Sequence, residues 1–139
     1  MQILLALLLF LLPVSGNKQA KPQSSVKINV FKNVPDDLTG CGDDYYLSNA
    51  DKSKQQLICR TDYVTALIYI NNQPVRFKAQ QKSITKNETI YTSGKYMLTV
   101  KKLLEKQLDS EYFIMKGIIT LKAGDKIIFT QKIIGEGGC

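Results

Sequence analysis

The sequence predicts an all-β fold: a small antiparallel meander barrel or sandwich of about 7–8 strands, preceded by a signal peptide. First, apolar and polar residues alternate along several short segments, which is the period of a half-buried strand. Second, turn residues separate these segments at short intervals. Third, the chain lacks the amphipathic helical segments that a parallel α/β sheet needs between its strands. Together these patterns favour a small antiparallel barrel or sandwich.

The start of the chain has the character of a secretory signal. Residues 3–14 carry no polar side chain, and the small residues Ser15 and Gly16 follow them. This run is too short for a membrane-spanning helix but has the length of a signal-peptide core. We therefore predict a signal peptide at residues 1–16, a flexible lead at residues 17–25 and a single β domain at residues 26–139. This organisation implies a secreted or periplasmic protein without a transmembrane segment in its mature chain.

The first half of the β domain contains four predicted strands and one long loop. Asparagine tolerates positive φ, so the pair Asn71-Asn72 indicates a hairpin turn between two of these strands. The predicted elements are a strand over residues 26–30, a loop over 34–49, strands over 55–60 and 64–70, a turn at 71–73 and a return strand over 75–79.

The second half is predicted to end in a long hairpin. Residues 80–92 are polar and predict a connection, and residues 96–100 alternate as a strand does. The predicted elements after that strand are one or two helical turns or a charged loop over 103–110, a long strand over 113–121, a three-residue loop at 123–125 and a return strand over 127–133.

The available side chains argue against catalysis. The chain has no histidine, which removes the commonest general base and the commonest metal ligand. The acidic pairs Asp36-Asp37 and Asp43-Asp44 lie in the predicted loop and lack the spacing of an EF-hand. We therefore expect no catalytic residue, no metal and no cofactor, and we treat these four aspartates as a candidate acidic loop.

The three cysteines predict one disulfide and one leftover thiol, because an odd number cannot pair completely in an oxidising compartment. Cys139 ends the chain after a glycine-rich run, and Cys41 lies between two glycines. Cys59 lies in a strand-like run, where a buried inert thiol is the ordinary role. We predict a Cys41–Cys139 disulfide, with Cys59–Cys139 as the alternative.

The formal net charge of +7 falls outside residues 1–16, which have no charged side chain. Of 19 basic residues only Arg60 and Arg76 are arginines, so specific nucleic-acid binding is disfavoured, since bidentate phosphate recognition relies on arginine. The predicted 123–125 loop would place Lys122 opposite Lys126 and Lys116 opposite Lys132 on the last hairpin. Like charges in such positions repel, which suggests an anionic partner, while edge protection and solubility are the alternative. The candidate anion-binding residues are Lys116, Lys122, Lys126 and Lys132.

Three short motifs resemble a group of small secreted bacterial proteins of unknown activity. Members of this group end in Gly-Glu-Cys-Gly-Cys, which is similar to residues 133–139 (Ile-Ile-Gly-Glu-Gly-Gly-Cys). Their early Gly-Cys-x-Cys-Tyr segment is similar to residues 40–45, and their Ile-Asn-Gly-Lys-x-Val hairpin to residues 70–75. Asp43 or a neighbour, and Gly137, stand where the group has two further cysteines. The resemblance thus implies that one disulfide has been lost beside a retained Cys41–Cys139.

Residues 92–96 (Thr-Ser-Gly-Lys-Tyr) are similar to the Ser-Gly-x-x-Tyr loop of periplasmic inhibitors of c-type lysozyme, which are small disulfide-tied antiparallel barrels. This resemblance implies that an acidic loop meets a basic enzyme, which the net charge of this chain opposes.

We therefore expect a non-enzymatic exported protein that binds an anionic envelope component, such as a glycan or a lipid, or an envelope protein. The alternatives are a lysozyme-inhibitor-like protein and a carrier of lipid or a small ligand, which would need an apolar cavity.

Overall fold

The computed structural model describes residues 25–139, so the predicted signal peptide and all but the last residue of the predicted lead lie outside the described residues. The described elements, in chain order, are β1 (Ile28–Asn29), η1 (Asp36–Leu38), β2 (Gly42–Tyr46), α1 (Asn49–Ser53), β3 (Cys59–Thr61), β4 (Thr65–Ile70), β5 (Gln73–Ala79), η2 (Gln81–Ser83), β6 (Glu88–Ser93), β7 (Tyr96–Gln107), β8 (Phe113–Ala123) and β9 (Lys126–Gly138).

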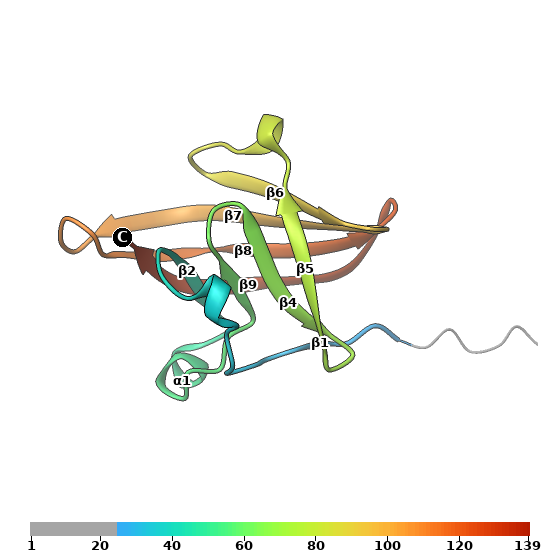
Figure 1. Cartoon of the computed structure of the whole chain (residues 1–139), viewed down its shortest axis with the longest axis horizontal. Helices are drawn as coiled ribbons and strands as arrows, with labels where there is room; N and C mark the ends of the chain where they lie inside the picture. The colour runs from blue at the N-terminus through green and yellow to red at the C-terminus, as the bar shows by residue number, and fades with distance from the viewer. Residues whose placement is uncertain (1–24) are drawn as a thin grey trace, which may run out of the picture.

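Strands β2 to β9 form a closed antiparallel barrel of eight strands (Figure 1). Each strand pairs with the next one in the sequence, and β9 pairs with β2 to close the barrel. The additional strand β1 pairs with β4 from outside this circuit. The prediction of an all-β antiparallel meander barrel is therefore confirmed.

Tight turns connect the strands of three hairpins. Asn71 and Asn72 have φ angles of 50° and 62°, which are the values that a two-residue type I′ turn requires. Gly94 and Gly124 also have positive φ at the β6–β7 and β8–β9 turns. The predicted turn at residues 71–73 is confirmed for its two asparagines, while Gln73 already belongs to β5.

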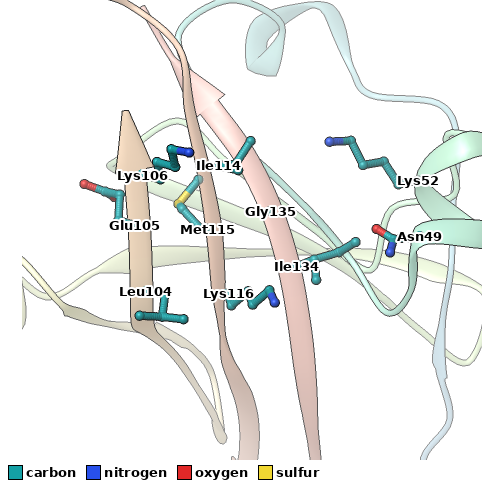
Figure 2. A pocket seen from close by; sticks show the side chains of 10 residues that line it. All are labelled: Asn49, Lys52, Leu104, Glu105, Lys106, Ile114, Met115, Lys116, Ile134 and Gly135. Carbon is teal, nitrogen blue, oxygen red and sulfur yellow. The ribbon is translucent and has the colours of Figure 1, made fainter. Parts of the chain in front are cut away.

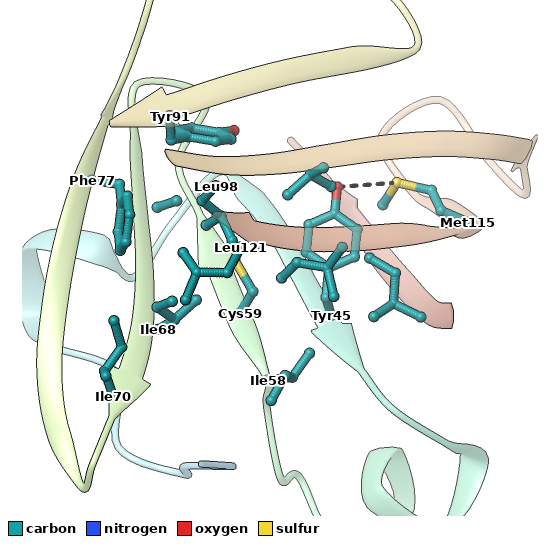
Figure 3. Close-up of a cluster of buried hydrophobic side chains, with 14 residues drawn as sticks. Tyr45, Ile58, Cys59, Ile68, Ile70, Phe77, Tyr91, Leu98, Met115 and Leu121 are labelled. Atoms are coloured by element: carbon teal, nitrogen blue, oxygen red, sulfur yellow. Dashed lines mark hydrogen bonds between the residues drawn. The ribbon is translucent and has the colours of Figure 1, made fainter. Parts of the chain in front are cut away.

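Aromatic and branched aliphatic side chains fill the interior of the barrel (Figure 3). Phe77, Leu98 and Leu121 are completely buried, and the Tyr45 hydroxyl group lies 3.9 Å from the Met115 sulfur atom. The buried residues of this cluster are Tyr45, Ile58, Cys59, Ala66, Ile68, Ile70, Phe77, Tyr91, Leu98, Val100, Met115, Ile119, Leu121 and Ile133. They come from all eight strands of the barrel or the residues beside them, so the barrel closes around a single core.

A second apolar cluster lies outside the barrel, where the segment before β2 crosses β3 and β4. It consists of Phe31, Leu38, Tyr46, Leu57 and Leu67. Arg60, on β3, fixes this crossing because its Nε donates to the Leu38 carbonyl group at 2.9 Å and its Nη2 to the Gly40 carbonyl group at 2.6 Å.

Three predicted loops are partly strands. The predicted loop over residues 34–49 contains β2, the predicted connection over residues 80–92 contains most of β6, and residues 103–107 continue β7. Each missed strand is short or carries polar side chains, so its alternation is weak. A β-bulge between Lys102 and Leu104 further interrupts the pattern of β7.

The predicted register of the last hairpin was wrong. The turn has two residues, since Ala123 pairs with Lys126, and a bulge near Leu121 shifts the rest of the ladder. Lys116 lies opposite Ile134 and Lys122 opposite Ile127, so neither predicted lysine–lysine pair forms.

Candidate anion-binding face

Side chains that point away from the barrel on β7, β8 and β9 form one continuous surface, which we call the outer face. The register sets Lys101, Ile118 and Lys132 side by side across the three strands. Lys116 is the diagonal neighbour of Lys132, at a Cα separation of about 7 Å. Ile118 is thus surrounded by Lys101, Lys116 and Lys132, which we call the lysine cluster.

The lysine cluster lacks neutralising partners among residues 25–139. Its three members are exposed, and none takes part in an ion pair with a described residue. The only carboxylate that the register places on this face is Glu136, at its far end. An unneutralised cluster of this kind attracts anions, and the attraction weakens as salt is added.

The structure brings together only two of the four predicted lysines. Lys116 and Lys132 belong to the cluster, whereas a row of threonines, among them Thr120 and Thr130, separates Lys122 from it. Lys126 pairs with Ala123 and therefore lies on the opposite side of the sheet from Lys122. Lys101 was not predicted as a member, because only the pairing of β7 with β8 reveals its place.

Exposed apolar side chains lie beside lysines of the outer face. Leu104 is 65% exposed, Ile127 53% and Met97 37%, and all three point outward from the same sheet. The outer face therefore combines cationic and apolar groups, as surfaces that bind anionic amphiphiles do.

A groove of about 350 Å³ lies between the outer face and α1 (Figure 2). Leu104, Ile114 and Ile134 supply its apolar side chains, and Asn49 and Lys52 stand on the α1 side. Lys106 and Lys116 also line it, and neither has an ion-pair partner in the described chain.

A hydrogen-bonded cluster around Glu136 closes one end of the outer face. Lys52 Nζ lies 2.8 Å from the Glu136 carboxylate, which also accepts hydrogen bonds from the hydroxyl groups of Tyr46 and Tyr112. Burial by itself raises the pKa of Glu136, but these donors outweigh it, so the pKa lies below its ordinary value. Glu136 is therefore anionic and already satisfied, and Lys52 is held as a wall of the groove.

The candidate acidic loop does not exist as one surface. Asp37 forms an ion pair with Arg76, and Asp44 forms one with Arg60 at 3.1 Å. Asp43 points into the barrel and lies 3.3 Å from Lys102. Only Asp36 is left exposed without a described ion-pair partner, so most of the predicted acidic charge is neutralised.

Polar groups line a smaller pocket of about 130 Å³ at the end of the barrel. Here Lys102 bridges Asp43 and Glu105, and the Tyr45 hydroxyl group donates to Asp43 at 3.2 Å. Burial by itself lowers the pKa of Lys102, but the two carboxylates outweigh it and raise the pKa. Because these groups satisfy one another, we assign them a structural role.

The Cys41–Cys139 disulfide prediction is confirmed, with the two Cα atoms 4.7 Å apart. Cys59 is free and completely buried in the core. Burial raises the pKa of its thiol, and Arg60 points to the other face of β3, so Arg60 does not activate the sulfur atom.

Known family models, curated proteins and solved structures were compared with this chain, and none matches. Over residues 25–139, the chain forms no helix that is both long and apolar enough to cross a membrane. The same residues contain no group of three metal-ligating side chains that could hold an ion.

Proposed function

We propose that this chain is a non-enzymatic exported protein that binds an anionic envelope component through the outer face of β7, β8 and β9. The observation that carries the proposal is the lysine cluster, whose three charges are exposed and lack ion-pair partners among the described residues. Repulsion among these charges is relieved when an anion binds, so the cluster favours a complex.

The disulfide supports the exported part of the proposal. Cys41 and Cys139 are joined, and such bonds persist mainly in oxidising compartments outside the cytosol. A signal peptide at residues 1–16 agrees with this location and remains a prediction.

The two alternative functions have weaker support. A lysozyme-inhibitor-like role relied on an acidic loop, and Asp37, Asp43 and Asp44 are each paired with a basic residue. A carrier role relied on an apolar cavity inside the barrel, where large side chains such as Phe77 and Tyr91 pack together.

Retention on heparin-agarose tests the proposal. The chain should bind at low salt and elute as salt screens its charges. A variant in which all three residues of the lysine cluster become glutamine should elute at clearly lower salt than the unchanged protein.

A matched control separates the outer face from general basicity. Lys27, Lys54 and Lys78 are exposed and lie on other elements, and changing them to glutamine lowers the net charge from +7 to +4, as in the cluster variant (7 − 3 = 4). The proposal expects the control to elute close to the unchanged protein. Equal elution of both variants, or no retention of the unchanged protein at low salt, would refute it.

A further inference from the structure

We propose that the groove between α1 and the outer face binds one single-chain anionic amphiphile, a molecule with a fatty-acid-like chain and an anionic head group. This inference rests on the proposed function, because it gives the anionic partner a chemical class and a place on the outer face. Leu104, Ile114 and Ile134 would contact the chain, and Lys106 and Lys116 would contact the head group.

The apolar residues of the groove occupy two adjacent rows of the outer face, where Ile114 is the diagonal neighbour of Leu104 and of Ile134. Leu104, Lys116 and Ile134 occupy one row across the sheet, and Lys106, Ile114 and Glu136 occupy the next. The groove leaves Ile114 and Ile134 only partly buried, and Leu104 is 65% exposed. An acyl chain lying in the groove would remove this side chain from water.

The charges in the groove select an anionic head group. Lys106 and Lys116 stand in adjacent rows and are free of ion pairs within the described residues. Glu105, the carboxylate that also lines the groove, is already paired with Lys102. Lys52 is already paired with Glu136, so it only lines the groove. Lys106 and Lys116 are therefore the lysines that can bind the head group. A neutral head group would leave both of these lysines without a partner.

The size of the groove limits the ligand. Its volume of about 350 Å³ is near the lower end of the range for small-molecule sites, roughly 300–1,000 Å³. One chain of medium length fits this space better than a lipid with two chains. The ligand also lies outside the barrel, so this site does not require the filled core to open.

Calorimetric titration with dodecanoate, below its micelle-forming concentration, tests the inference on the full chain. We expect saturable binding of one dodecanoate, and at least tenfold weaker binding of butanoate, because its short chain buries less apolar surface. The neutral amphiphile dodecyl maltoside should also bind at least tenfold more weakly. Amide shifts on dodecanoate binding should be confined to residues 49–52, 104–106, 114–116 and 134–135.

Two pairs of variants locate the site. Leu104→Ser should weaken dodecanoate binding about tenfold, while Val64→Ser, at an exposed aliphatic residue just before β4 and away from the outer face, should leave it unchanged. Lys106→Gln with Lys116→Gln should weaken it at least tenfold, while Lys122→Gln with Lys126→Gln should not.

Several results would overturn this inference. They are absence of dodecanoate binding, equal effects of the paired variants, and shifts spread over the barrel core. Binding of the unchanged protein only to phosphatidylglycerol vesicles, with no dodecanoate bound, would indicate membrane docking and also overturn it. If dodecanoate does not bind but heparin retention still depends on the lysine cluster, only this inference fails and the proposed function stands. If heparin retention does not depend on the lysine cluster either, the proposed function also fails.

Discussion

Removal of the Cys41–Cys139 disulfide should cost this domain much of its stability. The bond spans 98 positions of sequence, and the chain-entropy relation gives a stabilisation of about 4.7 kcal/mol for a loop of that length at 25 °C. The bond joins the ends of β2 and β9, which are already paired from Gly42 opposite Gly138 to Tyr46 opposite Ile134. Since backbone pairing already holds these strand ends together in the folded state, we expect the loss to arise mainly from the greater freedom of the unfolded chain.

Urea unfolding measures this loss directly. A Cys41→Ser/Cys139→Ser variant should unfold with a free energy about 4 to 5 kcal/mol lower than the oxidised protein, and its melting temperature should fall by about 20 °C. The unchanged protein in reductant should approach the variant, and the variant itself should not respond to reductant. A loss below about 1 kcal/mol would refute the entropic reasoning, and a response of the variant to reductant would show that Cys59 forms a bond.

Three further results are expected. Lys102→Met leaves Asp43 buried without its cation, so the free energy of unfolding measured in urea should fall by about 3 kcal/mol. Adding Asp43→Asn to this variant should restore much of the lost stability, and no recovery would contradict a buried ion pair. Cys59 should resist a thiol reagent in the folded protein and react on unfolding, because burial raises its pKa; rapid native reaction would contradict this. Glu136 has a pKa below its ordinary value of 4.5 when folded, so the unfolded state binds more protons. The contribution of Glu136 to stability is present above pH 4.5 and is lost as pH falls through the folded pKa. Glu136→Gln should therefore make the free energy of unfolding less sensitive to pH in that range. An unchanged pH dependence would contradict the lowered pKa of Glu136.

The parts of the fold that were predictable have strong local signals. The β4–β5 hairpin follows from Asn71-Asn72, because these residues accept the positive φ of a tight turn. The alternation through Leu98 and Ile119 marks strands with one buried face, and both side chains are in the core. The closed circuit of the barrel follows less directly, since it depends on pairing between β2 and β9 at opposite ends of the domain.

The candidate site was only partly predictable, because its geometry depends on registers that the sequence does not specify. The lysine cluster needs Lys101 from β7 and Lys132 from β9 on either side of Ile118, and two bulges set that arrangement. The wrong turn length at Ala123 moved every predicted partner on the last hairpin, although it left Lys116 and Lys132 on one face. The groove depends on the position of α1, for which the pattern over residues 34–49 gave no signal.

The register of β2 and β9 shows how the two positions at which the similar small secreted proteins have further cysteines lie in this fold. Asp43 and Gly137 are directly paired, next to the end at which Cys41 and Cys139 are bonded. A Cβ atom added at Gly137 would lie 2.0 Å from the Asp43 carboxylate, so the side chains of these two positions point to the same space. Two cysteines there could face each other, whereas this chain fills the space with a carboxylate held by Lys102 and Tyr45. The absence of a side chain at Gly137 makes room for that carboxylate. A buried polar cluster therefore occupies the place in which a second covalent link between the two closing strands would fit, and the barrel depends on Cys41–Cys139 alone for its covalent closure.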